Sequence, residues 1–139
     1  MIFFISFFRF SSQKKQETDT IKISFQDTTF TTWVSETYQE KQEGLSIFNS
    51  LGKQEAMLFI FDKTGKHSFW MKNMKFPIDI VWLDEDKKIV FLKENARPED
   101  FPQSYGGEID SHYVLEFAKD SITQYNMREG DYFYWKETY

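Results

Sequence analysis

Cysteine is absent from this 139-residue sequence, so disulfide bonds, thiolate nucleophiles and cysteine-ligated zinc sites are all excluded. Only two histidines, His67 and His112, are present, and they share no metal-ligand spacing. The acidic run at 84–88 resembles a calcium loop, but it lacks the glycine and the distal glutamate of an EF-hand. We therefore predict neither a metal site nor a cofactor.

Other signatures of function are missing as well. The sequence has no serine nucleophile elbow and no glycine-rich loop of the kind that holds phosphate. Basic residues are not in excess, because the net charge is −5 and acids and bases are mixed along the chain. A nucleic-acid partner would require a basic face, so we predict no nucleic-acid binding.

The first 20 residues differ from the rest of the chain. Residues 1–10 are almost entirely apolar, and residues 11–20 are polar, lack aromatics and have the composition of a flexible tether. The apolar run is shorter than the roughly 20 residues of a membrane-spanning helix, and it lacks the basic start and small-residue cleavage site of a signal peptide. A truncated export signal, a membrane-surface anchor and an edge strand all stay open. We favour export or anchoring, which predicts membrane association through residues 1–10 and a cell-envelope location; a cytoplasmic location is the alternative.

Aromatic residues are abundant, at 19 % of the chain, and such large flat side chains favour a β-rich fold. Alternating or continuous apolar runs bounded by turn residues predict strands. The predicted strands are 21–25, 28–34, 56–61, 68–74, 76–83, 88–94, 112–117 and 131–135. Residues 62–66 and 84–88 are predicted turns, and 78–94 is therefore a predicted hairpin.

Two short helices are predicted between the strands. Thr37 and Glu40 form a capping box with Gly44 as the stop, and Asp120 and Gly130 bound the second helix in the same way. No helix is long enough for a regular series of βαβ crossovers. We predict one mainly β domain over residues 21–139, an antiparallel sandwich or strongly curled barrel with two short helices.

Polar side chains interrupt the apolar stretch HSFWMKNMKFPIDIVWL at 67–83, and a glutamate interrupts YVLEF at 113–117. Burial without a partner costs roughly 2 kcal/mol or more even for a neutral polar group. Lys72, Asn73, Asp79 and Glu116 therefore need partners. They form either a structural network that fixes strand register or the polar groups of a ligand pocket floored by Trp70.

Several sequence blocks also resemble a known family. GLS, AMLFIF, FWMKNMKFPIDIVWLD, ENARP, YVLEF and MREGD occur in the order seen in the domain of unknown function 192 family, over residues 27 to 135. The resemblance implies a small jelly-roll β-sandwich that in bacteria often follows an export or lipoprotein signal. It implies no activity, because none is established for the family.

The chain departs from the family pattern at several positions, which are Ser46, Asn49, Ala56, Met74 and Asp120. Asn49 matters most, because an arginine is common there. If that arginine contacts an anionic ligand, this chain would bind the ligand less well. The lipobox cysteine of some exported members is also absent, so covalent lipid anchoring is not available.

Our first functional prediction is a non-enzymatic ligand-binding module of the cell envelope. Its pocket for a small anionic or sugar-like ligand would be built by Trp70, Lys72, Asn73, Asp79 and Glu116, with the loop 95–111 as a further wall. Lys72 would supply positive charge and Asn73 a bidentate amide, and the two carboxylates would orient them.

Two alternatives stay open. The first is a hydrolase acting on a polysaccharide or similar envelope polymer, with Asp79 and Glu116 as the general acid and base. The second is a membrane-tethered interaction module that meets its partner through the loop 95–111, which an exposed aromatic patch near that loop would support. The oligomeric state is not predicted.

Overall fold

The computed structural model describes residues 20–137, so the predictions for residues 1–19 lie outside the described part of the chain. The strands in that part are β1 (Thr20–Phe25), β2 (Thr28–Ser35), β3 (Glu55–Lys66), β4 (Phe69–Trp70), β5 (Ile78–Leu83), β6 (Ile89–Ala96), β7 (Ser104–Tyr105) and β8 (Asp110–Ala118). The helices are α1 (Tyr38–Glu43) and α2 (Ser121–Gln124), with two 3-10 turns, η2 (Gly44–Ile47) and η3 (Pro98–Asp100). The predicted mainly β fold with short helices is confirmed.

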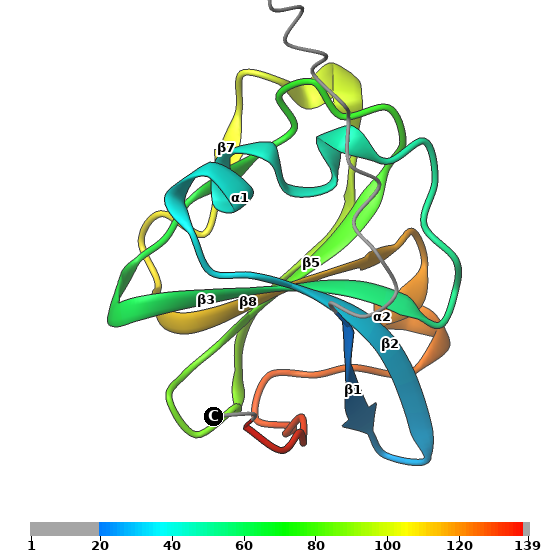
Figure 1. Ribbon diagram of the computed structural model, residues 1–139, viewed down its shortest axis with the longest axis vertical. Coiled ribbons are helices and arrows are strands. Elements are labelled where there is room, and N and C mark those ends of the chain that lie inside the picture. The colour runs from blue at the N-terminus through cyan, green and yellow to red at the C-terminus, as the bar shows by residue number, and fades with distance from the viewer. Residues whose placement is uncertain (1–19, 138–139) are drawn as a thin grey trace, which may run out of the picture.

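Six strands form one curled sheet in the order β1-β2-β3-β8-β5-β6, and β4 pairs with β7 in a separate two-stranded sheet (Figure 1). All pairings are antiparallel except β2 with β3, whose parallel pairing requires a crossover. The segment containing α1 and η2 provides that crossover. The sheet does not close into a barrel.

The start of α1 follows the predicted capping box. The Glu40 backbone N–H donates to the Thr37 hydroxyl at 3.2 Å, and the Glu40 carboxylate accepts from the Thr37 backbone N–H at 3.2 Å. These two bonds satisfy amides that a helix start otherwise leaves unpaired. Gly44 has φ +49° at the C-terminal end, where the chain turns into η2.

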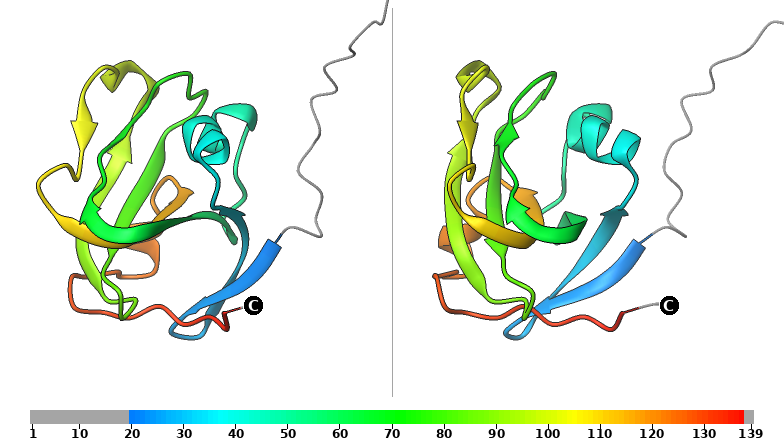
Figure 2. Two further views of the ribbon diagram at one scale, coloured as in Figure 1. Left: turned by 60° about the vertical axis from the view of Figure 1, so that its left-hand side comes forward. Right: turned by 90° about the vertical axis from the view of Figure 1, so that its left-hand side faces the viewer.

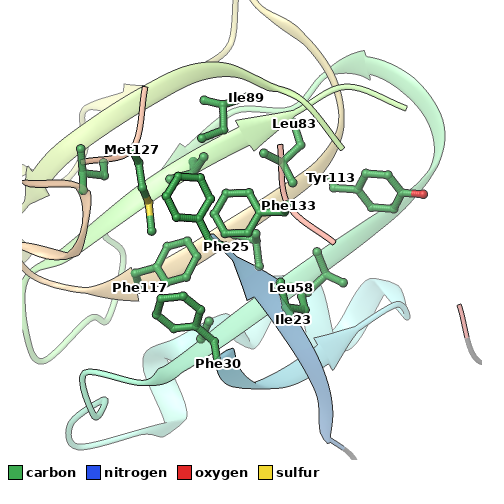
Figure 3. Close-up of a cluster of buried hydrophobic side chains, with 14 residues drawn as sticks. Ile23, Phe25, Phe30, Leu58, Leu83, Ile89, Tyr113, Phe117, Met127 and Phe133 are labelled. Atoms are coloured by element: carbon green, nitrogen blue, oxygen red, sulfur yellow. The ribbon is translucent and has the colours of Figure 1, made fainter. Parts of the chain in front are cut away.

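The inner face of the curled sheet holds the larger core. Figure 3 shows Phe25, Phe117 and Phe133 gathered there, with ring centroids of Phe25 and Phe133 4.8 Å apart. The chain after α2 crosses the open side of the curl, where Ser24 exchanges two backbone hydrogen bonds with Tyr134 (Figure 2). This segment therefore links the edge strand β1 to the turn between β5 and β6, where Phe133 N–H donates to Lys87.

The outer face of the same sheet carries a second core. The crossover segment and the β4–β7 pair lie together on this side of β3 and β8 (Figures 1 and 2). They bury Leu45 and Met71 against Met57, Ile80 and other side chains of the sheet. Because both faces of the central strands are covered, β5 is buried along its whole length, and all of its residues except Asp79 are apolar.

Four predicted segments differ from the structure. The second helix, predicted between Asp120 and Gly130, spans only Ser121–Gln124, and the Asp120 side chain makes no capping hydrogen bond. Residues 62–66 were predicted as a turn, but β3 continues to Lys66, because after a register shift Gly65 pairs with Ser111 of β8. The predicted strand 68–74 ends at Trp70, since Met74 N–H donates to the Met71 carbonyl in a turn. Residues 131–135 form isolated bridges rather than a strand.

No helix between residues 20 and 137 is long and apolar enough to cross a membrane.

Candidate functional site

The five residues predicted to form one pocket lie at three separate places. Trp70, Lys72 and Asn73 are exposed around the end of β4, whereas Asp79 on β5 and Glu116 on β8 are buried. The strands predicted to bring them together do not pair, because β4 pairs with β7 and β5 lies between β8 and β6. The strand pairings therefore do not place Asp79 opposite Lys72 or Asn73.

Lys72 and Asn73 owe their position to a turn. Asn73 has φ +60°, a left-handed conformation that asparagine tolerates better than most residues. Both side chains face solvent, so neither carries the desolvation penalty that their apolar neighbours in the sequence suggest. The Lys72 ammonium lies 5.4 Å from the centroid of the Trp70 ring, within the range of a cation–π contact.

Asp79 is a buried carboxylate with structural partners. Its Oδ1 accepts from the Asn95 backbone N–H at 2.8 Å, and its Oδ2 accepts from the Ile122 backbone N–H at 2.9 Å. Asp79 thereby caps the first turn of α2 and holds Asn95 of β6, which has φ +48°. Burial raises the pKa of Asp79, and these backbone donors oppose the rise.

Glu116 is buried without comparable support. Only 5 % of the residue is exposed, and its Oε2 has no hydrogen-bond partner in the described part of the chain. Burial raises the pKa of Glu116 to about 8. At neutral pH the side chain is therefore mostly a neutral carboxylic acid, which can donate one hydrogen bond and accept others.

Asp79 and Glu116 do not form the predicted acid–base pair. In the pairing of β5 with β8, Asp79 is opposite Phe117 and Glu116 is opposite Ile80. Paired residues of an antiparallel sheet point to the same side and adjacent residues to opposite sides. Asp79 therefore lies on the inner face with Phe117, and Glu116 lies on the outer face with Ile80.

Two further polar atoms share the outer face with Glu116. Trp33 Nε1 and Ser35 Oγ are buried without a hydrogen-bond partner in the described residues. Trp33 is in register with Met57, which is in turn opposite Glu116, so the three form one row across β2, β3 and β8. Ser35 is two residues further along β2 and points to the same side.

The same row continues from Glu116 through Ile80 of β5 to Lys93 of β6. Lys93 is the basic residue of this row. The Lys93 ammonium lies 4.8 Å from the centroid of the Tyr105 ring. We refer below to Trp33, Ser35 and Glu116 as the buried polar row.

A second group of side chains lies on the surface. Trp70 and Phe101 are 49 % and 42 % exposed, and their ring centroids are 5.2 Å apart at an interplanar angle of 60°. With Lys72 over the indole, these residues form what we call the aromatic–lysine surface. Single exposed apolar residues are common, but two large aromatic rings in contact on the surface are a feature of interaction sites.

Asp100 fixes the loop that presents Phe101. Its carboxylate accepts from the Arg97 backbone N–H at 2.9 Å, the Arg97 guanidinium at 3.1 Å and the Tyr105 hydroxyl at 2.9 Å. These donors lower the pKa of Asp100, and burial together with the Asp100 contact raises the pKa of Tyr105 to about 12. The loop is therefore held at both ends of the segment that carries Phe101.

The histidines have local roles. His67 stacks on Phe61 with ring centroids 3.6 Å apart, and a His112 ring nitrogen lies 3.2 Å from the Thr64 hydroxyl oxygen. Within residues 20–137, no three histidine, aspartate or glutamate side chains gather into a group that could hold a metal ion.

Sequence reasoning missed Phe101, Trp33 and Ser35. The loop 95–111 was a predicted wall of the site, but nothing in its sequence singled out Phe101. The strand pattern of 28–34 indicated a packed Trp33, yet the lack of a partner for its indole N–H follows only from the strand register and the covering segment.

The fold is shared with solved structures. A protein from Sinorhizobium meliloti 1021, provisionally described as a transcription regulator, superposes with a TM-score of 0.75 at 22 % identity, covering 83 % of this chain and 91 % of that one. A protein of unknown function from Novosphingobium aromaticivorans superposes with a TM-score of 0.73 at 25 % identity, covering 84 % of each chain. No functionally curated protein matches the sequence.

The family comparison agrees with the resemblance found in the sequence blocks. The model of the family DUF192, described as "Uncharacterized ACR", matches residues 20–135, which include the whole curled sheet, the buried polar row and the aromatic–lysine surface. This chain belongs to the DUF192 family.

Proposed function

We propose that this protein is a non-enzymatic binding module whose aromatic–lysine surface holds an acidic, sugar-containing polymer. The observation that carries the proposal is the contact between Trp70 and Phe101, two half-exposed rings with the ammonium of Lys72 beside them. This replaces the single five-residue pocket predicted from the sequence with a smaller, open surface.

The chemistry of the surface suits a sugar chain. The apolar C–H faces of sugar rings can cover the exposed aromatic area, and burial of such area contributes about 25 cal/mol per Å². Trp70 and Phe101 meet at 60°, so they offer an angled platform to successive rings of a chain. An exposed carboxylate or sulfate of the polymer would meet Lys72, whose position over the indole already restricts its motion.

Local charge favours an anionic ligand although the whole chain is acidic. The segment 67–78 contains Lys72 and Lys75 and no aspartate or glutamate. The loop beside Phe101 carries Arg97, Glu99 and Asp100, which sum to −1, so the two segments together have a net charge of +1. The Lys75 ammonium lies 3.4 Å from Asn49 Oδ1, so a positive charge stands beside the position where the family pattern commonly has arginine. This local excess of positive charge supports binding of an anion at the turn.

The cell envelope remains the proposed location. The apolar residues 1–10 and the polar tether support it, since acidic polysaccharides are exposed there. Those residues lie outside the described part of the chain.

Binding to labelled polygalacturonate, an acidic polymer, and to dextran, a neutral one, tests the proposal. We expect polygalacturonate to bind more tightly, and Trp70→Ala and Phe101→Ala each to weaken that binding by about tenfold or more. Tyr38→Ala is the matched control, because Tyr38 is an exposed aromatic on α1. Lys72→Met should weaken binding of the acidic polymer only. Lys22→Met, which removes an exposed lysine of the edge strand β1, is its control.

Two outcomes would overturn the proposal. Equal loss of binding in Trp70→Ala and Tyr38→Ala would show that the aromatic–lysine surface is not the binding site. Preference for duplex DNA or for a purified protein over both polymers would replace the proposed ligand class.

A further inference from the structure

The buried polar row shares no residue with the aromatic–lysine surface and has no part in the function proposed above. Among residues 20–137, four buried side-chain polar atoms lack a hydrogen-bond partner, and three of them, on Trp33, Ser35 and Glu116, lie on the outer face of the sheet. The fourth, Ser111 Oγ, belongs to β8 but points to the inner face, in phase with Tyr113. Buried polar atoms without partners are uncommon, so three on one face call for a common explanation.

These three groups lie close enough to contact one small molecule. Trp33 and Glu116 are separated by one strand, and neighbouring strands lie about 4.8 Å apart, so their backbones are roughly 10 Å apart. Ser35 is two residues from Trp33, or roughly 7 Å along β2. The indole and glutamate side chains rise from the same face of the sheet, on either side of the buried Met57 of β3.

The crossover segment that covers this face beside Trp33 is short and largely exposed. The structure describes every residue of α1, and none of them is buried; η2 contributes only Leu45. Phe48, which follows η2, packs edge-on against Trp33 with ring centroids 5.0 Å apart. A small molecule can therefore reach the row by displacing part of a short, largely exposed segment, without any change in the sheet.

We propose that the buried polar row binds a small uncharged molecule with an amide head group and a compact apolar tail, between the outer face of the sheet and the crossover segment. The indole N–H of Trp33 donates to the amide carbonyl. The carboxyl group of Glu116 exchanges a pair of hydrogen bonds with the amide, and Ser35 accepts from its second N–H. Met57, Ile80 and Leu45 enclose the tail.

An uncharged ligand follows from the surroundings. Glu116 is a neutral acid at neutral pH, because burial raises its pKa to about 8. Lys93, the charged residue in the same row, contacts Tyr105 instead. An anion here would have no cation to meet, and a cation would require Glu116 to ionise in an apolar setting.

Three probes of the same shape separate the head-group classes: isobutyramide, isobutyrate and isobutylamine. Their dissociation constants for the full chain are measured at pH 6.5 by chemical-shift titration. We expect isobutyramide to bind at least about tenfold more tightly than the other two. Its shifts should centre on amides of β2, β3 and β8.

Substitutions in the buried polar row test whether isobutyramide binds there. Trp33→Phe keeps a ring but removes the N–H, and Glu116→Leu keeps bulk but removes both oxygens, so each should weaken isobutyramide binding by about tenfold or more. Glu116→Gln keeps a neutral hydrogen-bonding group and should change the dissociation constant of isobutyramide by less than threefold. Ser111→Ala is the matched control, because it removes an equally buried, unpartnered hydroxyl on the inner face and should leave binding unchanged.

Clear results would overturn the inference. One is that isobutylamine or isobutyrate binds more tightly than isobutyramide. Another is that no probe binds at 10 mM (about −2.7 kcal/mol). A third is that Ser111→Ala and Trp33→Phe weaken isobutyramide binding equally. A crystal structure of the soaked protein with only water bridging the three atoms would do the same. Loss of isobutyramide binding with polygalacturonate binding intact would leave the proposed function standing, so the two proposals fail separately.

Discussion

Two buried carboxylates on neighbouring strands have opposite roles in this fold. Asp79 and Glu116 are one register step apart on β5 and β8, and each is at least 95 % buried. Asp79, on the inner face, has each oxygen matched by a backbone N–H. Glu116, on the outer face, has one oxygen without any partner in the described residues. A buried charge with donors supports the fold, whereas a buried acid without them is available for a ligand.

The largest expected effect is on the pH dependence of stability. The pKa of Glu116 is raised from 4.5 to about 8 in the folded protein. The folded state therefore holds a proton that the unfolded chain releases, and the free energy of unfolding falls by roughly 1.4 kcal/mol per pH unit between these values. Glu116→Gln should remove this loss and be more stable than wild type by roughly 5 kcal/mol at pH 9.

Urea unfolding of both proteins at pH 4, 6.5 and 9 measures this difference. At pH 4 the two should be nearly equal, because Glu116 is protonated in both the folded and the unfolded state. A wild-type stability that is flat from pH 5 to 8 would contradict the burial described for Glu116.

Removing the other carboxylate should have the opposite sign. Asp79→Ala leaves the backbone N–H groups of Asn95 and Ile122 without their acceptor, and hydrogen bonds to charged groups contribute about 1.5–3 kcal/mol each. We expect a loss of about 3 kcal/mol at pH 7 in urea unfolding, with increased amide exchange at Ile122. Asp79→Asn retains one acceptor and should lose less; an equal loss would argue against the two-bond description.

Trp33→Phe should have a small effect on stability. The ring and its contact with Phe48 are retained, and the N–H that is removed has no partner to lose. We expect a change within about 1 kcal/mol of wild type in thermal unfolding. A larger loss would show that the indole N–H is paired in solution, which would remove one member of the buried polar row.

Lys72→Met should change stability least, by under about 0.5 kcal/mol, because the side chain is exposed on a turn. Circular dichroism during heating measures this directly, with Lys75→Met as the control. Unfolding of the Lys72 variant would instead support the structural network that the sequence left open.

Much of the fold could be predicted because local signals agreed with tertiary structure. The capping box at Thr37 and Glu40 forms as expected, and alternating apolar residues mark most strands. The hairpin between β5 and β6 also follows the prediction. Where local composition and long-range pairing conflict, the pairing decides, and so β3 continues through Gly65 beside Ser111 of β8.

The site was harder to predict, because burial was inferred from neighbours in sequence. Lys72 and Asn73 stand among apolar residues, yet the left-handed conformation of Asn73 turns the chain to the surface. The register of β5 with β8 decides which face of the sheet Asp79 and Glu116 occupy. A slip of one residue would exchange the two faces. Sequence alone identified these carboxylates as unusual but could not assign them to opposite faces.

The titration of the Glu116 carboxyl carbon, followed by carbon NMR, tests the central contrast most directly, with Glu116→Gln used to assign the signal. We expect a midpoint near pH 8, with the carboxyl group protonated at pH 6.5. A midpoint between 4 and 5 would mean that Glu116 is solvated or paired, and the distinction drawn between the two faces of the sheet would then be wrong.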